Sequence, residues 1–514
     1  MNRKQQIENA QNKHYDICII GGGITGTGIL YHAINNGYKT LLLEREDFAF
    51  GTSSRSSKMI HGGLRYLKNF QLKLVWEALH EREHLLQEFP HLVKPIKYIL
   101  PSYNSKLNWY KNRIGLTLYD ILAGKTSLPK HHTLTTQEVL KYLPNFNAKN
   151  LMGGVAYWDA QTNDAKLVLD VISNCNLKGT NAINYCGVTG INKSGNNIKN
   201  IECTDTLTQT KFNVNASVYI NATGVWTDEL LLQFSLKKTA VMKPSKGIHV
   251  IVSTDIMPKE TVVLVESSEN DGRFLYNLPW ENNLSILGTT DSNYTKHPNE
   301  VSTKKEDIDY ILNAFNKSFP AANITYKDII SVYAGLRPML ADEHTSSYEQ
   351  SREYKIWWNT ENMLTIAGGK LTSFLSMGKH CIDVVNKKNI PATSSSKPSQ
   401  KNNSPWQKVY GDMGYLIDKI ILEDAQNSIL FTPTFKYTNA EILFFIRYQS
   451  AETIDDIFTR RTHITYSMQK FNIELVQQLA TFMAKELNKT NDWIQQQIEL
   501  YKHCWAQYHP DFIQ

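Results

Sequence analysis

The sequence predicts an α/β fold with three parts: a Rossmann-like domain with a parallel sheet, a cap domain with an antiparallel sheet, and a small helical C-terminal domain. Three observations predict it. A short apolar run ends in a glycine cluster and leads into an apolar stretch of helical length. Between about 180 and 370, short β-rich runs separated by turns take over. Near the C-terminus, apolar residues recur every three or four positions, which is typical of helices.

Composition excludes several classes of protein. The chain has 514 residues, of which 41% are hydrophobic and 20% charged, enough for two or three cores, so we expect neither a disordered nor a fibrous protein. A net charge of +6 is too weak by itself to indicate nucleic-acid binding. The polar start and the lack of long apolar runs predict neither a signal peptide nor a spanning helix, and hence a cytoplasmic chain.

The cysteines and the metal-binding motifs complete this picture. The cysteines form no C-x-x-C pair, so we expect reduced, mostly buried thiols rather than disulfides or a zinc ribbon. No H-E-x-x-H or EF-hand spacing occurs, and we predict no metal. The cysteines are Cys18, Cys175, Cys186, Cys203, Cys381 and Cys504.

The first predicted elements form a dinucleotide-binding βαβ unit. The apolar run 15–20 is a strand, and GGGITG at 21–26 fits G-x-G-x-x-G. Gly21 permits the tight turn, Gly23 lets a pyrophosphate approach the backbone, and Gly26 lets helix and strand pack closely. The second strand, 39–44, ends in Glu44, which is placed to accept hydrogen bonds from a ribose. The alternative is a glycine-rich turn with a surface glutamate, and the motif does not separate NAD from FAD.

The later elements follow from periodicity and composition. Residues 74–89 carry apolar residues among charged ones at the spacing of an amphipathic helix. Residues 391–405 hold three prolines and many serines, which predicts a linker. The antiparallel sheet is expected from the runs HVIVS, TVVLVES, FLYNLPW, LSILGTTD, SVYAGLRPM and KIWWN. The C-terminal helix is expected from Ile473, Val476, Leu479, Met483 and Leu487.

Several blocks, in order, resemble the FAD-dependent, quinone-linked (aerobic-type) glycerol-3-phosphate dehydrogenases, within the glycine-oxidase-like flavoproteins. The resemblance is strong over residues 14–385 and weaker over the C-terminal domain, through 437–462. The blocks are GGGITGTG, LLLERED, TSSRSSKMIHGGLRYL, EALHEREHLL, GLTLYDILAGKTSLPKH, DAKLVLD, NATGVW, KGIHVIV, LGTTD, AGLRPM, SREY and AGGKLTSF.

The resemblance implies an FAD-dependent oxidoreductase region at 14–390, a linker at 391–405 and a helical domain at 406–514. The FAD-binding segments are expected at about 14–75, 150–235 and 330–390, interleaved with substrate-domain segments at about 76–149 and 236–329. The cofactor is FAD, and a helix N-terminus after Gly369 would stabilise negative charge on the reduced flavin. The expected FAD-binding residues are Gly21, Gly23, Gly26, Glu44, Thr52, Ser53, Ser57, Gly63, Ala222, Gly224, Gly368 and Gly369.

Cations in apolar runs predict an anionic substrate, because guanidinium groups match a phosphate bidentately. The resemblance implies sn-glycerol 3-phosphate as substrate and places Arg65, Arg337, Arg352 and Lys370 at the substrate end of the pocket, with His61 and Tyr66 nearby. We expect Arg65, Tyr66, His61 and Arg352 to bind the substrate, and His249, Arg337 and Lys370 to be the catalytic residues, with His249 chosen because an imidazole titrates near neutral pH. For each arginine the alternative is a structural ion pair, and for His249 it is a buried structural histidine. His249 and Arg337 are both candidates to handle the charge and proton of the substrate hydroxyl.

The electron acceptor is expected from the resemblance to be a membrane quinone; O2, with hydrogen peroxide as product, is the alternative. A non-catalytic FAD-binding interaction protein is the rival from another class. Residues 94–130 are rich in Lys and Arg, with Trp109, Tyr110 and Tyr119 interleaved, which fits either a peripheral contact with the anionic inner face of the cell membrane or a solvated loop. The sequence leaves a homodimer open.

Overall fold

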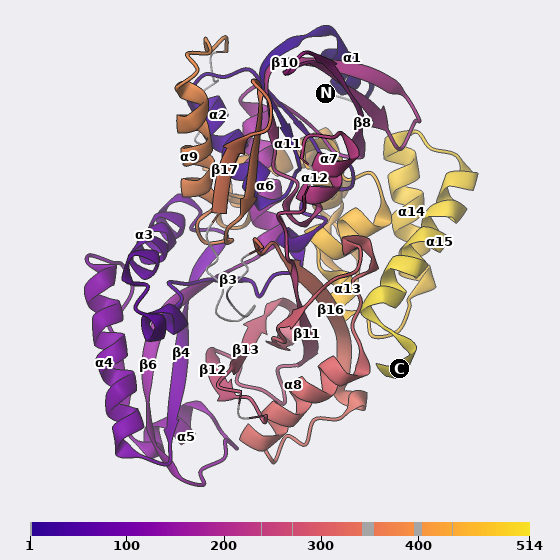
Figure 1. Ribbon diagram of the computed structural model, residues 1–514. Helices are drawn as coiled ribbons and strands as arrows, with labels where there is room; N and C mark the ends of the chain where they lie inside the picture. Colours follow the sequence, from indigo (N-terminus) through magenta and orange to yellow (C-terminus); the bar gives the residue numbers. More distant parts are fainter. Residues whose placement is uncertain are drawn as a thin grey trace.

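The computed structural model describes residues 3–237, 239–269, 271–341, 354–394, 403–433 and 435–513. Two large sheets stack one above the other in Figure 1, and the C-terminal helices lie along one side of both. Strands from distant parts of the sequence alternate between the two sheets, which agrees with the α/β fold with a cap sheet and a helical C-terminal part.

The first sheet has the order β17-β18-β10-β1-β2-β7. β18, β10, β1, β2 and β7 run parallel, and β17 runs antiparallel to β18. Parallel strands covered on both faces are buried along their length and mostly apolar, as β1 is after His14 and as β2 is. The strands are β1 (His14–Ile20), β2 (Thr40–Leu43), β7 (Asn181–Ile183), β10 (Lys211–Asn221), β17 (Tyr354–Trp358) and β18 (Met363–Gly368). β8 (Cys186–Ser194) and β9 (Asn197–Asp205) extend β10 antiparallel.

Three helices of this part pack together: α2 (Ile24–Asn35), α6 (Asp164–Leu177) and α9 (Phe374–Asn386). Helices α2 and α9 approach closely at Gly28 and Gly378. A Cβ on Gly378 would lie only 2.2 Å from the Gly28 carbonyl oxygen. The run KIWWN forms β17 and so pairs in this sheet, not in the cap sheet where the sequence analysis put it. Its hydrogen-bonding partner is β18, only a tight turn away.

The second sheet has the order β15-β11-β14-β13-β12-β4-β6-β3, with β16 paired to β11 and β5 to β6. It contains the expected runs from HVIVS to SVYAGLRPM. It also contains β3, β4 and β6, and the residues of β3, β6 and most of β16 fall in segments that the sequence analysis assigned to FAD binding. The strands are β3 (Met59–Ile60), β4 (Val93–Tyr103), β5 (His132–Leu134), β6 (Leu151–Thr162), β11 (Ser245–Ser253), β12 (Thr261–Glu266), β13 (Phe274–Trp280), β14 (Leu284–Gly288), β15 (Ser292–Asn293) and β16 (Ile329–Arg337).

Helices cover the outer parts of the second sheet. α8 packs on β11 and β12, while α3 and α4 pack on each other beside β4 and β6 (Figure 1). The amphipathic helix predicted at 74–89 is confirmed as α3. The bounds are α1 (Arg3–Asn12), which lies against the first sheet, and α3 (Leu72–Glu88), α4 (Lys106–Ala123), α5 (Thr136–Tyr142), α7 (Thr227–Gln233) and α8 (Lys305–Ser318).

The C-terminal part has an apolar core of its own, built from helices around a two-stranded hairpin. The predicted C-terminal helix is confirmed as α14 with its apolar positions at the expected spacing. Of the predicted linker, 395–402 lies outside the described residues. The bounds are α10 (Gln407–Tyr410), α11 (Gly414–Glu423), β19 (Leu430–Thr432), β20 (Phe435–Thr438), α12 (Asn439–Tyr448), a π-helical turn (Asp456–Arg461), α13 (Ile464–Ser467), α14 (Ile473–Leu487) and α15 (Asn491–Tyr508).

The cysteines are free thiols, buried except for the half-buried Cys504. Among the described helices, none is both long and apolar enough to cross a bilayer.

Candidate active site

The parallel strands β1, β2, β10 and β18 end at one edge of the first sheet, above the second sheet. Ligands of open α/β sheets bind beyond the carboxyl ends of such strands. Here the residues after each strand end line one cavity of about 880 Å³, at the upper end of the range for small-molecule sites. They are Gly21 and Gly23, Glu44, Ala222 to Gly224, and Gly368 to Lys370.

The glycine turn at the end of β1 is as close-packed as the motif requires. A Cβ on Gly21 would lie 2.5 Å from the Ala222 carbonyl oxygen, and its φ of +114° favours glycine. A Cβ on Gly26 would lie 1.9 Å from the Gly21 carbonyl oxygen. Gly26 therefore does not line the cavity and acts by letting helix α2 approach strand β1.

Glu44 closes this turn from the end of β2. Its carboxylate accepts hydrogen bonds from the backbone N–H of Gly22 at 2.7 Å and of Glu46 at 2.9 Å. Burial raises the pKa of Glu44, while these two N–H groups oppose the rise. Two backbone donors fix a carboxylate that borders the cavity, so Glu44 is oriented before any ligand arrives.

Residues 50–57 form the next wall. The Ser53 hydroxyl accepts a hydrogen bond from the Ile24 N–H at 2.8 Å, which ties this wall to the first turn of α2. The Thr52 hydroxyl donates to the Leu336 carbonyl at 2.6 Å, which ties it to β16. Thr52, Ser53, Ser57 and Gly63 all border the cavity.

The residues present fit a dinucleotide. Gly23, the residue before α2, carries no side chain that could cover the positive end of the helix, and the Ser53 hydroxyl takes only the first N–H, that of Ile24. A Cβ on Gly23 would lie 3.1 Å from the Ser53 hydroxyl, so even a methyl group would crowd the space between the glycine turn and Ser53. A bound FAD would be held by the glycine turn, Glu44 and the strand-end glycines, with its pyrophosphate at the start of α2.

His249 lies in the middle of β11 and is 1% exposed. Its Nε2 lies 3.1 Å from the Ser57 hydroxyl, and its ring stacks on Tyr333 with centroids 4.6 Å apart. Within the described residues Nδ1 has no hydrogen-bond partner. Burial, and then the charges of Arg337 and Lys58, hold the pKa of His249 well below its usual value. The imidazole is therefore neutral at physiological pH and able to accept a proton.

Arg337 ends β16 beside β11. Its guanidinium lies 3.3 Å from the Asp291 carboxylate and donates to the Thr289 hydroxyl at 3.2 Å and the Thr290 carbonyl at 3.0 Å. A Cβ on Gly247 would lie 2.5 Å from this guanidinium, so the glycine makes room for it. Arg337 is thus ion-paired and also lines the cavity.

Lys370 follows Gly368, the last residue of β18, and Gly369, which have φ of +89° and +92°. Its Nζ lies 4.0 Å from the centroid of the Tyr66 ring, a cation–π contact. Tyr66 is buried and contacts the lysine through its ring, but it does not line the cavity. His61 lines the cavity and donates its backbone N–H to the Thr372 hydroxyl at 3.3 Å.

Two expected residues cannot be placed. Arg352 lies outside the described residues, and Arg65 is described in its backbone only. Sequence reasoning also missed several groups. Asp291 and Thr289 hold the Arg337 guanidinium, and both belong to the LGTTD block. Lys58, the residue after Ser57, is fully buried and donates to the Asp164 carboxylate at 2.5 Å. Asp291 and Thr289 reach Arg337 because β14, β15 and β16 all pair with β11. In the described ranges, no group of three or more His, Cys, Asp or Glu side chains is arranged so that it could hold a metal ion.

Comparison with known proteins agrees with this geometry. The model of the family "FAD dependent oxidoreductase" matches residues 16–380. That of the "C-terminal domain of alpha-glycerophosphate oxidase" matches residues 379–494. The curated aerobic glycerol-3-phosphate dehydrogenase of Staphylococcus haemolyticus (strain JCSC1435) is 36% identical over 76% of this chain and 70% of its own. That of Staphylococcus aureus (strain USA300) is 36% identical over 75% of this chain and 69% of its own.

Solved structures show the same fold. The glycerol-3-phosphate dehydrogenase from Bacillus halodurans complexed with FAD has a TM-score of 0.79 at 25% identity and covers 98% of this chain and 97% of its own. The L-alpha-glycerophosphate oxidase from Mycoplasma pneumoniae has a TM-score of 0.57 at 15% identity and covers 75% of this chain and 97% of its own, which is a likeness of fold alone. The chain therefore belongs to the FAD dependent oxidoreductases and, within them, to the family of aerobic glycerol-3-phosphate dehydrogenases.

Proposed function

We propose that this enzyme oxidises sn-glycerol 3-phosphate to dihydroxyacetone phosphate and passes the electrons to a membrane quinone. The observation that carries the proposal is the position of His249, Arg337 and Lys370 on the wall of the cavity that the glycine turn also borders. A neutral base and two cations beside a dinucleotide site suit a substrate that is an alcohol and a phosphate at once.

The chemistry divides between the cofactor and the protein. Bound FAD supplies the acceptor for the hydride that leaves C2 of the substrate. His249 takes the hydroxyl proton, because burial keeps its imidazole neutral. Arg337 stabilises charge on the substrate oxygens while Asp291 holds its guanidinium in place. Lys370 contributes a second positive charge, held by the Tyr66 ring.

The surface around α4 supports a quinone as the acceptor. The cavity is lined on one side by Leu64 and Leu67, which precede α3, and by Ile114 and Leu118 of α4. Ile114 is also 69% exposed, so these apolar side chains, beside the polar Asn108, Lys111 and Asn112 of α4, reach the outside of the molecule. A lipid-soluble quinone needs an apolar entrance of this kind, whereas O2 does not.

The same region supports peripheral attachment to the cytoplasmic face of an anionic membrane. Large apolar side chains are exposed on α3, α4 and the turn before α3, including Phe70 at 86%. Apolar and basic residues exposed together suit the interface of an anionic bilayer. We define the α3–α4 surface as Phe70, Leu72, Trp76, Leu107, Tyr110, Ile114 and Ile121 with the exposed cations Lys73, Lys106, Lys111, Arg113 and Lys125.

The expected membrane segment 94–130 is corrected in one respect. Tyr119 is 2% exposed and donates its hydroxyl hydrogen to Asp159 at 2.8 Å, so it faces the interior. The Trp109 indole donates to the Gly154 carbonyl at 3.2 Å and is only half-exposed. Of the three aromatic residues, Tyr110 is the exposed one.

The test of the function is anaerobic reduction of the yellow holoenzyme. Glycerol 3-phosphate should bleach the flavin absorbance within the dead time of a manual assay, and glycerol at the same concentration should leave it nearly unchanged. A flavin that both compounds bleach equally, or that neither bleaches, would refute the proposal. Reoxidation by a short-chain quinone faster than by air would support the quinone over O2.

A further inference from the structure

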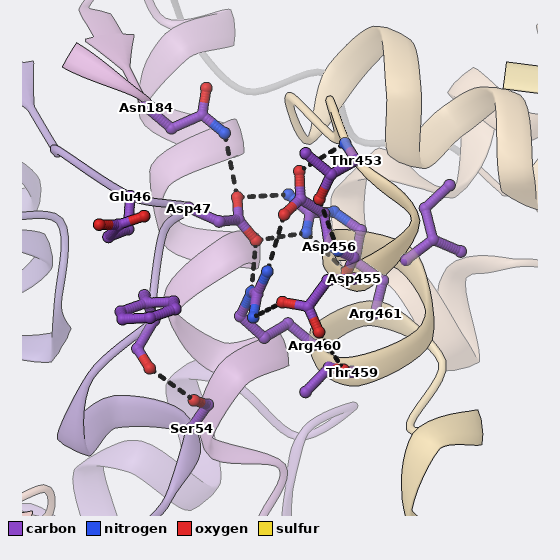
Figure 2. A network of polar contacts seen from close by, with 12 residues as sticks. Glu46, Asp47, Ser54, Asn184, Thr453, Asp455, Asp456, Thr459, Arg460 and Arg461 are labelled. Atoms are coloured by element: carbon purple, nitrogen blue, oxygen red, sulfur yellow. Dashed lines mark hydrogen bonds and ion pairs between the residues drawn. The ribbon is translucent and has the colours of Figure 1, made fainter. Parts of the chain in front are cut away.

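Buried charges join the C-terminal part to the loop that follows Glu44 (Figure 2). Arg461 forms a bidentate pair with Asp47, with distances of 2.7 Å and 3.1 Å. Arg460 donates to the same carboxylate at 2.6 Å and to Asp456 at 2.7 Å. The side chain of Asn184 donates to Asp47 at 3.0 Å and to the Ser450 carbonyl at 2.8 Å.

The network is shielded from water. Asp47, Asp456 and Arg461 are fully buried, and Arg460 is 2% exposed. Burial opposes ionisation of Asp47, but Arg461 and Arg460 outweigh it and hold the pKa of Asp47 below its ordinary value. A buried pair of this kind adds little stability over an apolar contact, yet removing one partner is costly. Its main effect is therefore to fix the relative position of the segments that it joins.

Asp47 lies in the segment 44–54, which we call the 44–54 loop and which borders the cavity on its other face. Glu44, Arg45 and Glu46 before it and Phe50 to Ser53 after it line the cavity, whereas Asp47 does not. The loop also contacts the glycine turn, because the Ala49 N–H donates to the Gly22 carbonyl at 3.1 Å. The arginines thus hold the loop from behind at the point where its front borders the dinucleotide site.

The loop depends on such support from outside. Residues 44–51 form no helix or strand, so few local hydrogen bonds fix their backbone. Ala49 has a φ of +64°, a left-handed conformation that costs a non-glycine residue about 1 kcal/mol or more. Surrounding contacts must impose this conformation, and the carboxylate of Asp47 lies two residues away.

We propose that Asp47, Arg460 and Arg461 are positioning residues for FAD: the C-terminal part holds the 44–54 loop in its FAD-binding conformation through Asp47. The inference rests on the placement of FAD at the glycine turn and not on the identity of the substrate. Linkage makes it reciprocal, so bound FAD must also strengthen the contact between Asp47 and the arginines.

The experiment compares two Asp→Asn variants of the same network. Asp47→Asn removes the contact with the loop. Asp455→Asn is the matched control, because Asp455 accepts from the other side of Arg460 at 2.8 Å and does not touch the loop. Apoprotein of each variant and of the wild type is titrated with FAD, and amide hydrogen exchange is followed over 44–54.

We expect Asp47→Asn to raise the Kd for FAD by about tenfold or more and to speed exchange over 44–54. Asp455→Asn should stay within about twofold of the wild type in both measurements. If the network served stability alone, Asp47→Asn would lower the melting temperature of the apoprotein and leave the Kd unchanged. That result would overturn the proposal, as would equal losses in both variants.

A milder variant covers the case in which Asp47→Asn does not fold. Arg461→Lys keeps the charge but loses the bidentate geometry, and we expect a Kd for FAD raised by about threefold or more. An unchanged Kd in this variant would also overturn the proposal. Normal FAD binding in a wild-type enzyme that glycerol 3-phosphate fails to reduce would instead refute the proposed function.

Discussion

The Ser57 hydroxyl lies 3.1 Å from Nε2 of His249, which links the cofactor wall directly to the buried histidine of β11. Ser57 belongs to the segment that ties α2 to β16, and His249 belongs to the second sheet. This hydrogen bond joins the proposed base, which β11 and the Tyr333 ring also hold, to the wall of the proposed flavin site. The position of the base should then depend on the same wall that holds the cofactor.

Replacing the base should slow the reaction without releasing FAD. We expect His249→Asn to lower kcat by about 100-fold, since a positioned general base contributes a factor of that order. The flavin absorbance per protein should stay normal. Stopped-flow reduction by glycerol 3-phosphate measures the effect, and a kcat within threefold of the wild type would return His249 to a purely structural role.

The pH profile gives an independent check of His249. Its pKa is held well below its usual value, so the imidazole stays neutral as the pH falls through 6.5. We therefore expect kcat at saturating substrate to show no acid limb with a midpoint near 6.5. Such a limb, present in the wild type and missing in His249→Asn, would contradict the low pKa.

The two cations should act on the substrate rather than on the cofactor. We expect Arg337→Leu and Lys370→Ala each to lower kcat/KM for glycerol 3-phosphate by about 100-fold, because each loses a charged partner worth roughly 1.5–3 kcal/mol. FAD content should be unchanged. Arg447→Leu is the control, because Arg447 pairs with Glu423 and Glu486 on the surface of the C-terminal part. Normal kcat/KM in both site variants would remove them from the substrate site.

Glu44 should govern FAD retention. Glu44→Ala removes the proposed ribose acceptor and the partner of the Gly22 and Glu46 N–H groups. We expect a Kd for FAD about 10- to 100-fold weaker, from the loss of a charged hydrogen bond. Glu44→Gln, which keeps one acceptor oxygen, should fall between the wild type and Glu44→Ala in apoprotein titrations. FAD that remains attached after acid precipitation would show a covalent bond instead.

Stability should fall as the pH drops below 6.5. Burial lowers the pKa of His509 to about 4, so between pH 6.5 and 4 the unfolded chain binds a proton that the folded chain does not. For this histidine the loss amounts to about 2 kcal/mol at pH 5. His509→Phe should reduce the difference in unfolding free energy between pH 7 and pH 5 by that amount in urea titrations. His503→Phe, at an exposed position of α15, is the control for replacing a histidine near this end of the chain with phenylalanine.

The α3–α4 surface should control membrane binding. We expect the double variant Phe70→Ser, Ile121→Ser to bind anionic vesicles about tenfold more weakly at low salt, because each side chain loses apolar area for the interface. Leu422→Ser is the control, since Leu422 is 86% exposed on α11. Cosedimentation at low and high salt measures binding. Wild-type protein that stays in the supernatant at low salt would refute the attachment.

Local patterns predicted the elements whose form depends on neighbours in sequence. The glycine turn needs only the backbone geometry of residues 21–26, and α14 shows its apolar stripe in five residues. β4 was missed because its sequence, VKPIKYILPSY, contains lysines and prolines that disguise a strand. Its pairing with β6, some fifty residues away, is what defines it. No local pattern could have shown this.

The candidate site shows the same limit. Arg337 was predicted from its residue type and from the resemblance. Its pairing with Asp291 depends on two strand pairings: β16, which ends at Arg337, lies along one edge of β11, and β15, which follows Asp291, lies along the other edge. Tyr119 looked like an interfacial aromatic because it stands in a basic segment. The side of α4 on which it lies packs against β6, where Asp159 accepts its hydrogen bond.

The glycine turn packs against the backbone of Ala222, and Asp47 in the loop beside it pairs with Arg461. This has a consequence for the order of events on the ribosome. The turn is translated before the backbone that packs on Gly21 and before the guanidinium that pairs with Asp47. A nascent chain cannot complete this cavity until residue 461 has left the exit tunnel. FAD that needs the complete cavity can therefore bind only after this point.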